Sequence, residues 1–259
     1  MSKKTKAKIK TTNRNTNDNG ANTKLNFNLK EIEPLTPNQK KAFESYDEGY
    51  NLVLHGSAGT GKTFISLYLA LEELLDFKSF FNDIVIIRSV VPSRDMGFLP
   101  GTIKEKSEIY ENPYKQICAE IFERGDAYDI MKLKNLIRFE TTSFLRGLTF
   151  RNSIVIVDEC QNMQGGELNT VMTRMGENSK IIFSGDFRQT DLSRYEDKLG
   201  LKDFLAVLER MKTFSYVEFD KEDIVRSGLV KEFIIKQSEY EDEKYELKRN
   251  GKQELSKSF

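Results

Sequence analysis

Residues 56–63 restrict the fold of this chain more than any other segment. They follow a short apolar run at 51–55, precede a helical pattern, and read Gly56-Ser57-Ala58-Gly59-Thr60-Gly61-Lys62-Thr63. The glycines allow backbone N–H groups to turn inward, because glycine tolerates positive φ and has no Cβ to block an anion. The alternative is an ordinary glycine-rich turn, but the strand, loop and helix in this order predict a phosphate-binding loop.

Each group of this loop has an expected task. The helix that begins near Gly61 directs the positive end of its dipole at the phosphates. Lys62 is expected to reach the β- and γ-phosphates, and the Thr63 hydroxyl to bind Mg²⁺. The loop therefore predicts binding of a nucleoside triphosphate together with Mg²⁺.

Apolar and helical patterns alternate between residues 36 and 236. Most strand candidates are continuous apolar runs, which predicts strands covered on both faces. We expect an α/β fold, a mostly parallel sheet with helices on both faces. The expected strands are 51–55, 84–88, 136–141, 153–158, 180–184 and 215–219, and the expected helices are 37–48, 62–75, 113–123, 127–135, 167–175, 201–210 and 228–236.

The two ends of the chain differ from this middle part. Residues 1–30 hold eight basic residues and one acidic residue, a local charge of +7, although the whole chain is neutral. With few large apolar side chains this segment cannot offset chain entropy, so a disordered basic tail is predicted. Residues 238–259 are predicted to form a charged tail, which leaves 31–237 as one domain.

The composition excludes several classes of protein and several kinds of catalytic site. No apolar run is long enough to cross a bilayer, and no hydrophobic signal core follows the basic start, so we expect a cytoplasmic protein without membrane contact. Cys118 and Cys160 lack metal-ligand spacing and are interpreted as reduced thiols. His55 is the single histidine, which excludes Ser-His, Cys-His and multi-His metal chemistry and favours a packing or hydrogen-bonding role at the end of the first strand.

A second motif ends the apolar strand at 153–158. Asp158 and Glu159 stand at its carboxyl end, the edge at which the phosphate loop of a parallel sheet also lies. We expect Asp158 to hold Mg²⁺ and Glu159 to orient and polarise the attacking water. Surface charge is the alternative interpretation, and the complete phosphate loop about a hundred residues earlier favours the functional one.

The next strand leads into a segment that reads Gly185-Asp186-Phe187-Arg188-Gln189. A neutral amide at this edge can sense the γ-phosphate without competing for the metal, and Gln189 is the candidate. An ordinary Gly-Asp turn is the alternative.

These motifs together resemble those of the PhoH-like proteins, relatives of superfamily 1 helicase motor domains. The resemblance covers roughly residues 36–236 and implies a RecA-like P-loop NTPase fold with ATP as the nucleotide. It rests on Gly56–Thr63, Asp158–Asn162 and Gly185–Gln189, with further support from Gly97–Gly101, Ser143–Gly147 and Asp223–Arg226.

The resemblance also implies roles for two more residues. Gln39, within Leu35–Gln39, is similar to the adenine-reading glutamine of helicases, although it could be a plain residue of a first helical turn. Arg226 resembles an arginine finger, which stabilises charge on the transferred phosphoryl group. Cys160 replaces the alanine usual in the family, and Ser227-Gly228 replaces a His-Pro pair after the arginine.

The chain has room for only one RecA-like domain. The finger must therefore come from a neighbouring subunit or fold back within the domain. We expect a homo-oligomer, a ring such as a hexamer, because heterologous contacts close only by rotation.

The function implied is Mg²⁺-dependent ATP hydrolysis coupled to single-stranded nucleic acid, RNA rather than DNA, with RNA helicase activity as one form. An ATP-switched binding module and a P-loop kinase for a small acceptor are the alternatives, and Glu159 and Gln189 argue against the kinase. A basic track across the loop-bearing edge is expected from Arg88, Arg94, Lys104, Lys106 and Arg146.

Overall fold

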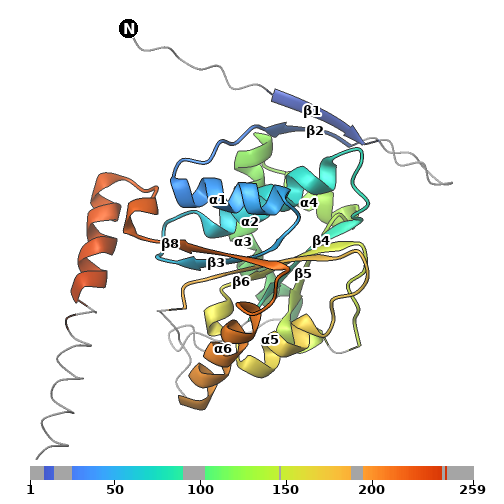
Figure 1. Ribbon diagram of the computed structural model, residues 1–259. Helices are drawn as coiled ribbons and strands as arrows, with labels where there is room; N and C mark the ends of the chain where they lie inside the picture. Colours follow the sequence, from blue (N-terminus) through green and yellow to red (C-terminus); the bar gives the residue numbers. More distant parts are fainter. Residues whose placement is uncertain are drawn as a thin grey trace, which may run out of the picture.

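The computed structural model describes residues 9–14, 25–89, 103–145, 147–187, 195–240 and 243. Among these residues, six strands form a parallel sheet in the order β5-β4-β6-β7-β3-β8 (Figure 1). Every strand lies within one residue of its predicted bounds, so the expected α/β fold is confirmed. The strands are β3 (Asn51–Gly56), β4 (Asp83–Arg88), β5 (Ile137–Thr141), β6 (Ser153–Asp158), β7 (Lys180–Gly185) and β8 (Phe214–Phe219).

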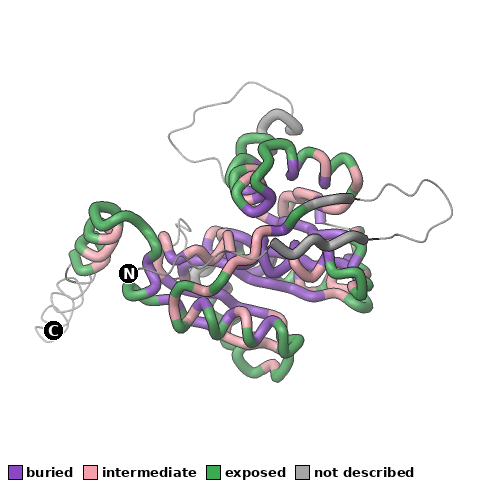
Figure 2. The backbone as a smooth tube through the Cα atoms, turned by 90° about the horizontal axis from the view of Figure 1, so that it is seen from above, coloured by how far each residue is buried: buried purple, intermediate pink, exposed green. Residues whose placement is uncertain are grey.

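Helices cover both faces of this sheet, as the continuous apolar strands predict. Leu52 and Leu54 of β3 pack into one core cluster with the first four helices, whereas Val53 packs into a second cluster with the other two. The strands lie buried between these layers (Figure 2). The first four helices are α1 (Pro37–Asp47), α2 (Lys62–Leu75), α3 (Ile103–Phe122) and α4 (Ala127–Leu133), and the other two are α5 (Gly165–Met172) and α6 (Tyr195–Leu208).

Three helices begin earlier than predicted, and the difference is smallest at α5, which spans Gly165–Met172 rather than 167–175. The sequence predicts a start at residue 113, where Pro113 would be the first helical residue, but α3 begins at Ile103 and continues through this proline. Proline lacks the N–H that would bond to the preceding turn, so it is a poor guide here to the helix start. Helix α6 begins at Tyr195 rather than at residue 201. Gly200, which directly precedes the predicted start, therefore lies inside the helix.

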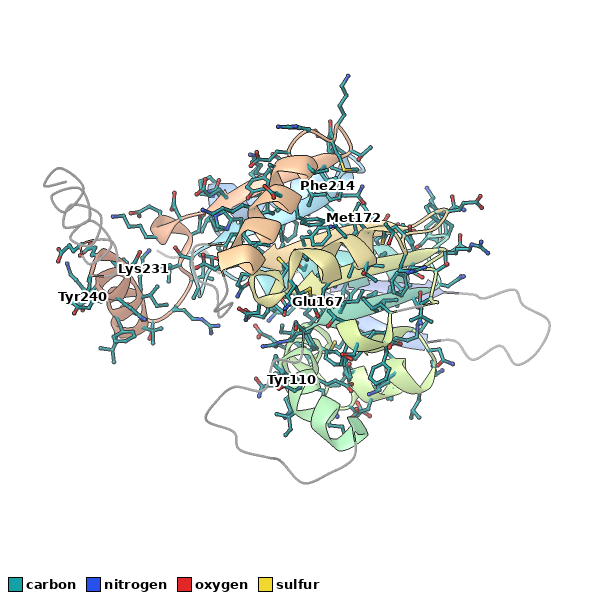
Figure 3. All side chains as sticks on the ribbon, turned by 90° about the horizontal axis from the view of Figure 1, so that it is seen from below. Tyr110, Glu167, Met172, Phe214, Lys231 and Tyr240 are labelled. Atoms are coloured by element: carbon teal, nitrogen blue, oxygen red, sulfur yellow. The ribbon has the colours of Figure 1, made fainter. Side chains whose placement is uncertain are left out.

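The described chain also contains three short 3₁₀ turns and one more helix. The turns are η1 (Thr142–Phe144), η2 (Cys160–Asn162) and η3 (Lys221–Asp223). A helix spans 228–240, four residues beyond its predicted end, and we call it the C-terminal helix. It stands beside the layered domain, and Figure 3 shows Lys231 and Tyr240 on it.

The prediction of a disordered tail over residues 1–30 is wrong for two segments. Strands β1 (Ile9–Arg14) and β2 (Leu25–Lys30) pair antiparallel in a two-stranded sheet. Leu29 is 5% exposed and belongs to the first core cluster. The alternation of apolar and polar residues over 25–30 is a strand pattern that the abundance of Lys and Asn obscures. None of the helices in the described ranges is both long and apolar enough to span a membrane.

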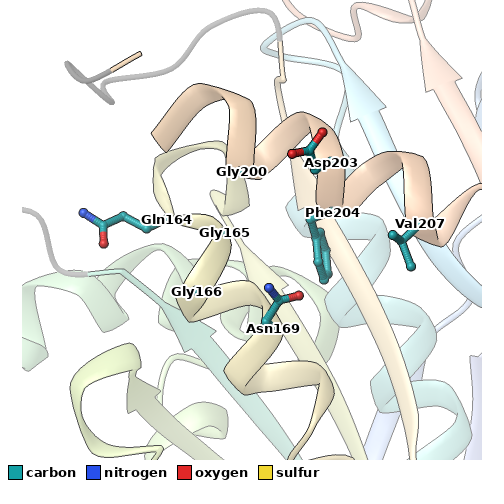
Figure 4. Close-up of a pocket in the computed structure, with 8 residues that line it drawn as sticks. All are labelled: Gln164, Gly165, Gly166, Asn169, Gly200, Asp203, Phe204 and Val207. Carbon is teal, nitrogen blue, oxygen red and sulfur yellow. The ribbon is translucent and has the colours of Figure 1, made fainter. Parts of the chain in front are cut away.

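Helices α5 and α6 cross at a pair of glycines (Figure 4). A Cβ atom on Gly165 would lie 2.9 Å from the backbone of Gly200, which is closer than the non-bonded contacts that Cβ atoms make in proteins. Beside the crossing lies a groove of about 380 Å³, lined in part by Asn169, Asp203 and Phe204. The close crossing packs both helices onto the same face of the sheet.

Replacement of Gly165 by alanine is expected to lower the free energy of unfolding by about 1–3 kcal/mol, because the two helices must move apart. Gly166 is the matched control, since a Cβ atom there would meet nothing within 4 Å. Gly166→Ala is expected to be neutral or stabilising by about 0.4–1 kcal/mol. Urea unfolding of both variants measures the difference, and equal stabilities would contradict the close crossing.

Candidate nucleotide-binding site

The predicted phosphate loop connects β3 to α2. Its three glycines all have positive φ, +132° at Gly56, +78° at Gly59 and +85° at Gly61. A Cβ atom on Gly56 would overlap the carbonyl oxygen of Phe219 in β8. Glycine is therefore required here both by the backbone conformation and by the neighbouring strand.

Lys62 begins α2 and lies over the loop that precedes it. Its ammonium group donates hydrogen bonds to the carbonyl oxygens of Gly56 and Ser57, each at 2.8 Å. Burial lowers the pKa of Lys62, and the nearby carboxylates of Asp186, Glu159 and Asp158 oppose this effect. The lysine and the acid pair thus share one site, as the sequence predicts.

Thr63 and Asp158 are the two expected metal ligands, and they are in contact. The Thr63 hydroxyl donates a hydrogen bond of 3.0 Å to Oδ1 of Asp158. Burial and the neighbouring Glu159 raise the pKa of Asp158, while Tyr114, Arg88 and Thr63 oppose the shift. A hydroxyl and a carboxylate are hard oxygen donors, so this pair fits Mg²⁺, which in such sites takes its other ligands from phosphates and water.

Glu159 follows β6 in the left-handed conformation, with φ of 52°. Gln161 donates from Nε2 to its carboxylate and accepts at Oε1 from the N–H of Asp186, at 3.1 Å. A Cβ atom on Gly185 would overlap Gln161. Gln161 therefore joins the end of β6 to the end of β7 and restrains Glu159, a role that the sequence analysis missed.

Gln189, the predicted γ-phosphate sensor, lies outside the described residues, and its role stays a prediction. The segment just before it contacts the strand that leads into the phosphate loop. The N–H of Phe187 donates to Nδ1 of His55 at 3.2 Å, and the two rings stack with centroids 4.7 Å apart. This contact confirms the packing and hydrogen-bonding role expected for His55.

Gln39 lies against the phosphate loop in the first turn of α1. Its Nε2 donates to the carbonyl oxygen of Thr60 at 3.0 Å, and its Oε1 accepts from the N–H of Leu35 at 2.8 Å. The side chain is 5% exposed. It thus connects α1 to the loop, and recognition of adenine by Gln39 stays a prediction.

Arg226 lies close to the phosphate loop of its own chain. The N–H of Val225 donates to the carbonyl oxygen of Gly59 at 3.1 Å, and Asn38 of α1 donates to the buried Asp223 carboxylate at 2.8 Å. A Cβ atom on Gly59 would lie 3.1 Å from Cγ of Arg226. The segment 223–226 is therefore held against the loop, and supply of the finger from a neighbouring subunit stays a prediction.

Most of the expected basic track lies outside the described residues, since Arg94, Arg146 and the side chains of Lys104 and Lys106 are not described, nor is the segment Gly97–Gly101. Arg88 is described, at the end of β4. Its guanidinium group lies 5.8 Å from the ring centre of Tyr110 and interacts with Tyr114 and Asp158. The Arg88 guanidinium group therefore lies near Asp158 and Glu159.

A parallel α/β sheet with a phosphate loop after β3 and an acid pair after β6 defines a RecA-like P-loop NTPase. The profile of the PhoH-like protein family matches residues 31–237. The chain therefore belongs to the PhoH-like family, and the resemblance noted in the sequence is confirmed.

Protein PhoH of Escherichia coli K12 is 36% identical over 176 residues, which are 67% of this chain and 49% of that protein. A PhoH-like protein of Synechocystis is 33% identical over 195 residues, 75% of this chain and 57% of its own length. The chain thus spans about half the length of these relatives. Among solved structures, the large terminase of a thermophilic bacteriophage matches 77% of this chain and 49% of its own, with a TM-score of 0.46 and 13% identity.

Both cysteines are buried and free. Burial raises the pKa of the Cys118 thiol to about 12. Burial, together with the adjacent Asp158 and Glu159, raises the pKa of Cys160 well above its usual value. Because the thiolate is the reactive form, neither thiol is expected to react with Ellman's reagent in the native protein at about pH 8.

Thiol titration in guanidinium chloride is the control for this prediction, and it is expected to reveal both cysteines. Rapid reaction of one thiol in the native protein would contradict the buried position of Cys160 or Cys118.

Proposed function

We propose that this chain is a Mg²⁺-dependent ATPase of the helicase-related type, whose hydrolysis is coupled to single-stranded nucleic acid, RNA rather than DNA. One observation carries the proposal. Lys62, the Thr63–Asp158 pair and Glu159 meet at the carboxyl ends of β3 and β6, two parallel strands of the sheet that have β7 between them. This is the edge of such a sheet at which ligands bind.

Each of these groups has a distinct task in hydrolysis. The N–H groups of the loop and Lys62 bind the phosphates of ATP, and Thr63 with Asp158 would hold Mg²⁺, which neutralises charge on the phosphate oxygens. Glu159 orients a water molecule for attack on the γ-phosphorus atom and accepts its proton. Gln161 restrains Glu159, so that the carboxylate keeps its position when water is bound.

The ATP-switched binding module is the second candidate, and one contact favours it. A Cβ atom on Gly59 would lie 3.2 Å from Ile234 of the C-terminal helix, so this helix packs directly on the phosphate loop. The same helix exposes Leu229, Phe233 and Tyr240 to solvent. A change in the loop on nucleotide binding could therefore reach an exposed apolar surface.

Glu159→Gln is expected to lower the rate of ATP hydrolysis by about 10²–10⁴-fold while ATP binding is retained, because only proton transfer is affected. Lys62→Ala is expected to abolish ATP binding. Glu123→Gln is the matched control, since Glu123 also has positive φ, at 53°, and lies on the surface away from the site. Phosphate release without any acceptor and equilibrium binding of labelled ATP measure these effects.

An unchanged rate in Glu159→Gln would contradict the assigned role of Glu159. If this variant retains nucleic-acid binding and every partner interaction, the switched module is favoured over the motor. Phosphate transfer that requires a small acceptor would instead indicate a kinase.

Single-stranded RNA is expected to stimulate ATP hydrolysis several-fold, and single-stranded DNA of the same sequence less. The stimulation is expected to weaken as the salt concentration rises, because phosphate contacts release counterions. Duplex RNA is the control. Equal rates with and without every nucleic acid would contradict the coupling.

The second part of the proposal is a homo-oligomeric ring in which Arg226 of one subunit completes the site of the next. Arg226→Ala is expected to lower the hydrolysis rate by about 10³–10⁵-fold, the range known for arginine fingers. Co-expression of Arg226→Ala with Glu159→Gln chains tests the arrangement. If the finger acts between subunits, about a quarter of the sites in a random ring contain both functional groups, so activity returns.

No recovery on mixing, or a fully active monomer by native mass measurement, would contradict the ring. Either result would assign Arg226 to the site of its own chain, beside which it lies.

A further inference from the structure

The carboxylate of Asp158 has two different neighbours on its two oxygens. Oδ1 accepts from the Thr63 hydroxyl at 3.0 Å, and Oδ2 accepts from the Tyr114 hydroxyl at 2.9 Å. Tyr114 lies in α3 and is 1% exposed. Asp158, the expected metal ligand, is therefore held by a residue of α3 as well as by Thr63 in α2, the helix that follows the phosphate loop.

Arg88 lies beside the hydrogen bond from Tyr114 to Asp158. Arg88 ends β4 and stands opposite Asp158 in the pairing of β4 with β6. Its guanidinium group interacts with both the Tyr114 side chain and the Asp158 carboxylate. An ionised carboxylate only accepts and arginine only donates, so the single phenolic proton of Tyr114 points to Asp158.

The hydroxyl of Tyr114 is not needed to fill space in the core, so its hydrogen bond to Asp158 is what distinguishes tyrosine from phenylalanine at this position. Phenylalanine would occupy nearly the same volume in the core and would leave Oδ2 without its donor. The carboxylate of Asp158 could then rotate away from Thr63, since only one of these two hydrogen bonds would remain.

We propose that Tyr114, supported by Arg88, is a positioning residue that orients Asp158 for Mg²⁺. The inference rests on the proposed ATPase function and deepens it. Groups that hydrogen-bond to metal-binding carboxylates orient them, and their loss commonly lowers metal affinity or activity by about 10–100-fold. Tyr114 holds Oδ2, which leaves Oδ1 and the Thr63 hydroxyl together on the side of the phosphate loop.

The test measures the affinity for a fluorescent ATP analogue over a range of Mg²⁺ concentrations. We call the Mg²⁺ concentration that gives half of the maximal increase in affinity for the analogue the Mg²⁺ midpoint. In Tyr114→Phe this midpoint is expected to rise about 10–100-fold. Affinity in EDTA is expected to stay unchanged, because Lys62 and the loop are untouched. Arg88→Met keeps the phenol and is expected to shift the midpoint in the same direction by a smaller factor.

Tyr128→Phe is the matched control. Tyr128 is also buried and donates to a carboxylate, that of Glu111, at 2.8 Å. Glu111 lies on α3, the helix that carries Tyr114, so this variant alters the packing of α3 without contact to Asp158. Its Mg²⁺ midpoint is expected to equal that of the wild-type chain, and its thermal stability to fall at least as much as that of Tyr114→Phe.

An unchanged midpoint in Tyr114→Phe, with a wild-type chain that responds to Mg²⁺, would overturn this inference alone. An equal shift in Tyr128→Phe would also overturn it, because the effect would then come from helix packing. If the nucleotide affinity of the wild-type chain does not change with the Mg²⁺ concentration, this result would overturn the proposed function and this inference together.

Discussion

The hydrogen bond between the Thr63 hydroxyl and the Asp158 carboxylate joins two groups that are 95 residues apart in the chain. It brings the start of α2 against the end of β6, and with it the phosphate loop against the acid pair. Asp158 is buried beside Glu159, and both burial and the neighbouring carboxylate raise its cost of ionisation. Thr63, Tyr114 and Arg88 oppose that cost, and their contacts hold the carboxylate at the edge where a nucleotide and its metal would bind.

The phosphate loop is also held from its other side. Strand β8 leaves no room for a side chain at Gly56, and segment 223–226 bonds to the carbonyl oxygen of Gly59. Gln39 bonds to the next carbonyl, that of Thr60. The loop therefore contacts α1, β8 and the C-terminal helix at once, which gives a physical route from the nucleotide to the surface of the domain.

The prediction of the fold was accurate where the signal is local. The strands are continuous apolar runs, and α1 begins at residue 37 as expected. It was wrong where a local signal had a competing cause. Pro113 suggests a helix start although α3 runs through it, and the basic composition obscures the strand pattern around Leu29. For the site, Lys62, Thr63, Asp158 and Glu159 could be found from motifs. Gln161 lies in the same motif as the acid pair, but its contacts could not be predicted, and Tyr114 carries no motif signal at all.

The sequence by itself determined the phosphate loop, the buried strands and the acid pair, because each depends on residue types at short spacing. Only the tertiary structure decided which side chains meet at these groups. The sheet order places β4 next to β6 and β7 next to β3, so Arg88 lies beside Asp158 and Phe187 beside His55. Such pairings depend on how distant segments pack, and periodicity along the chain carries no information about them.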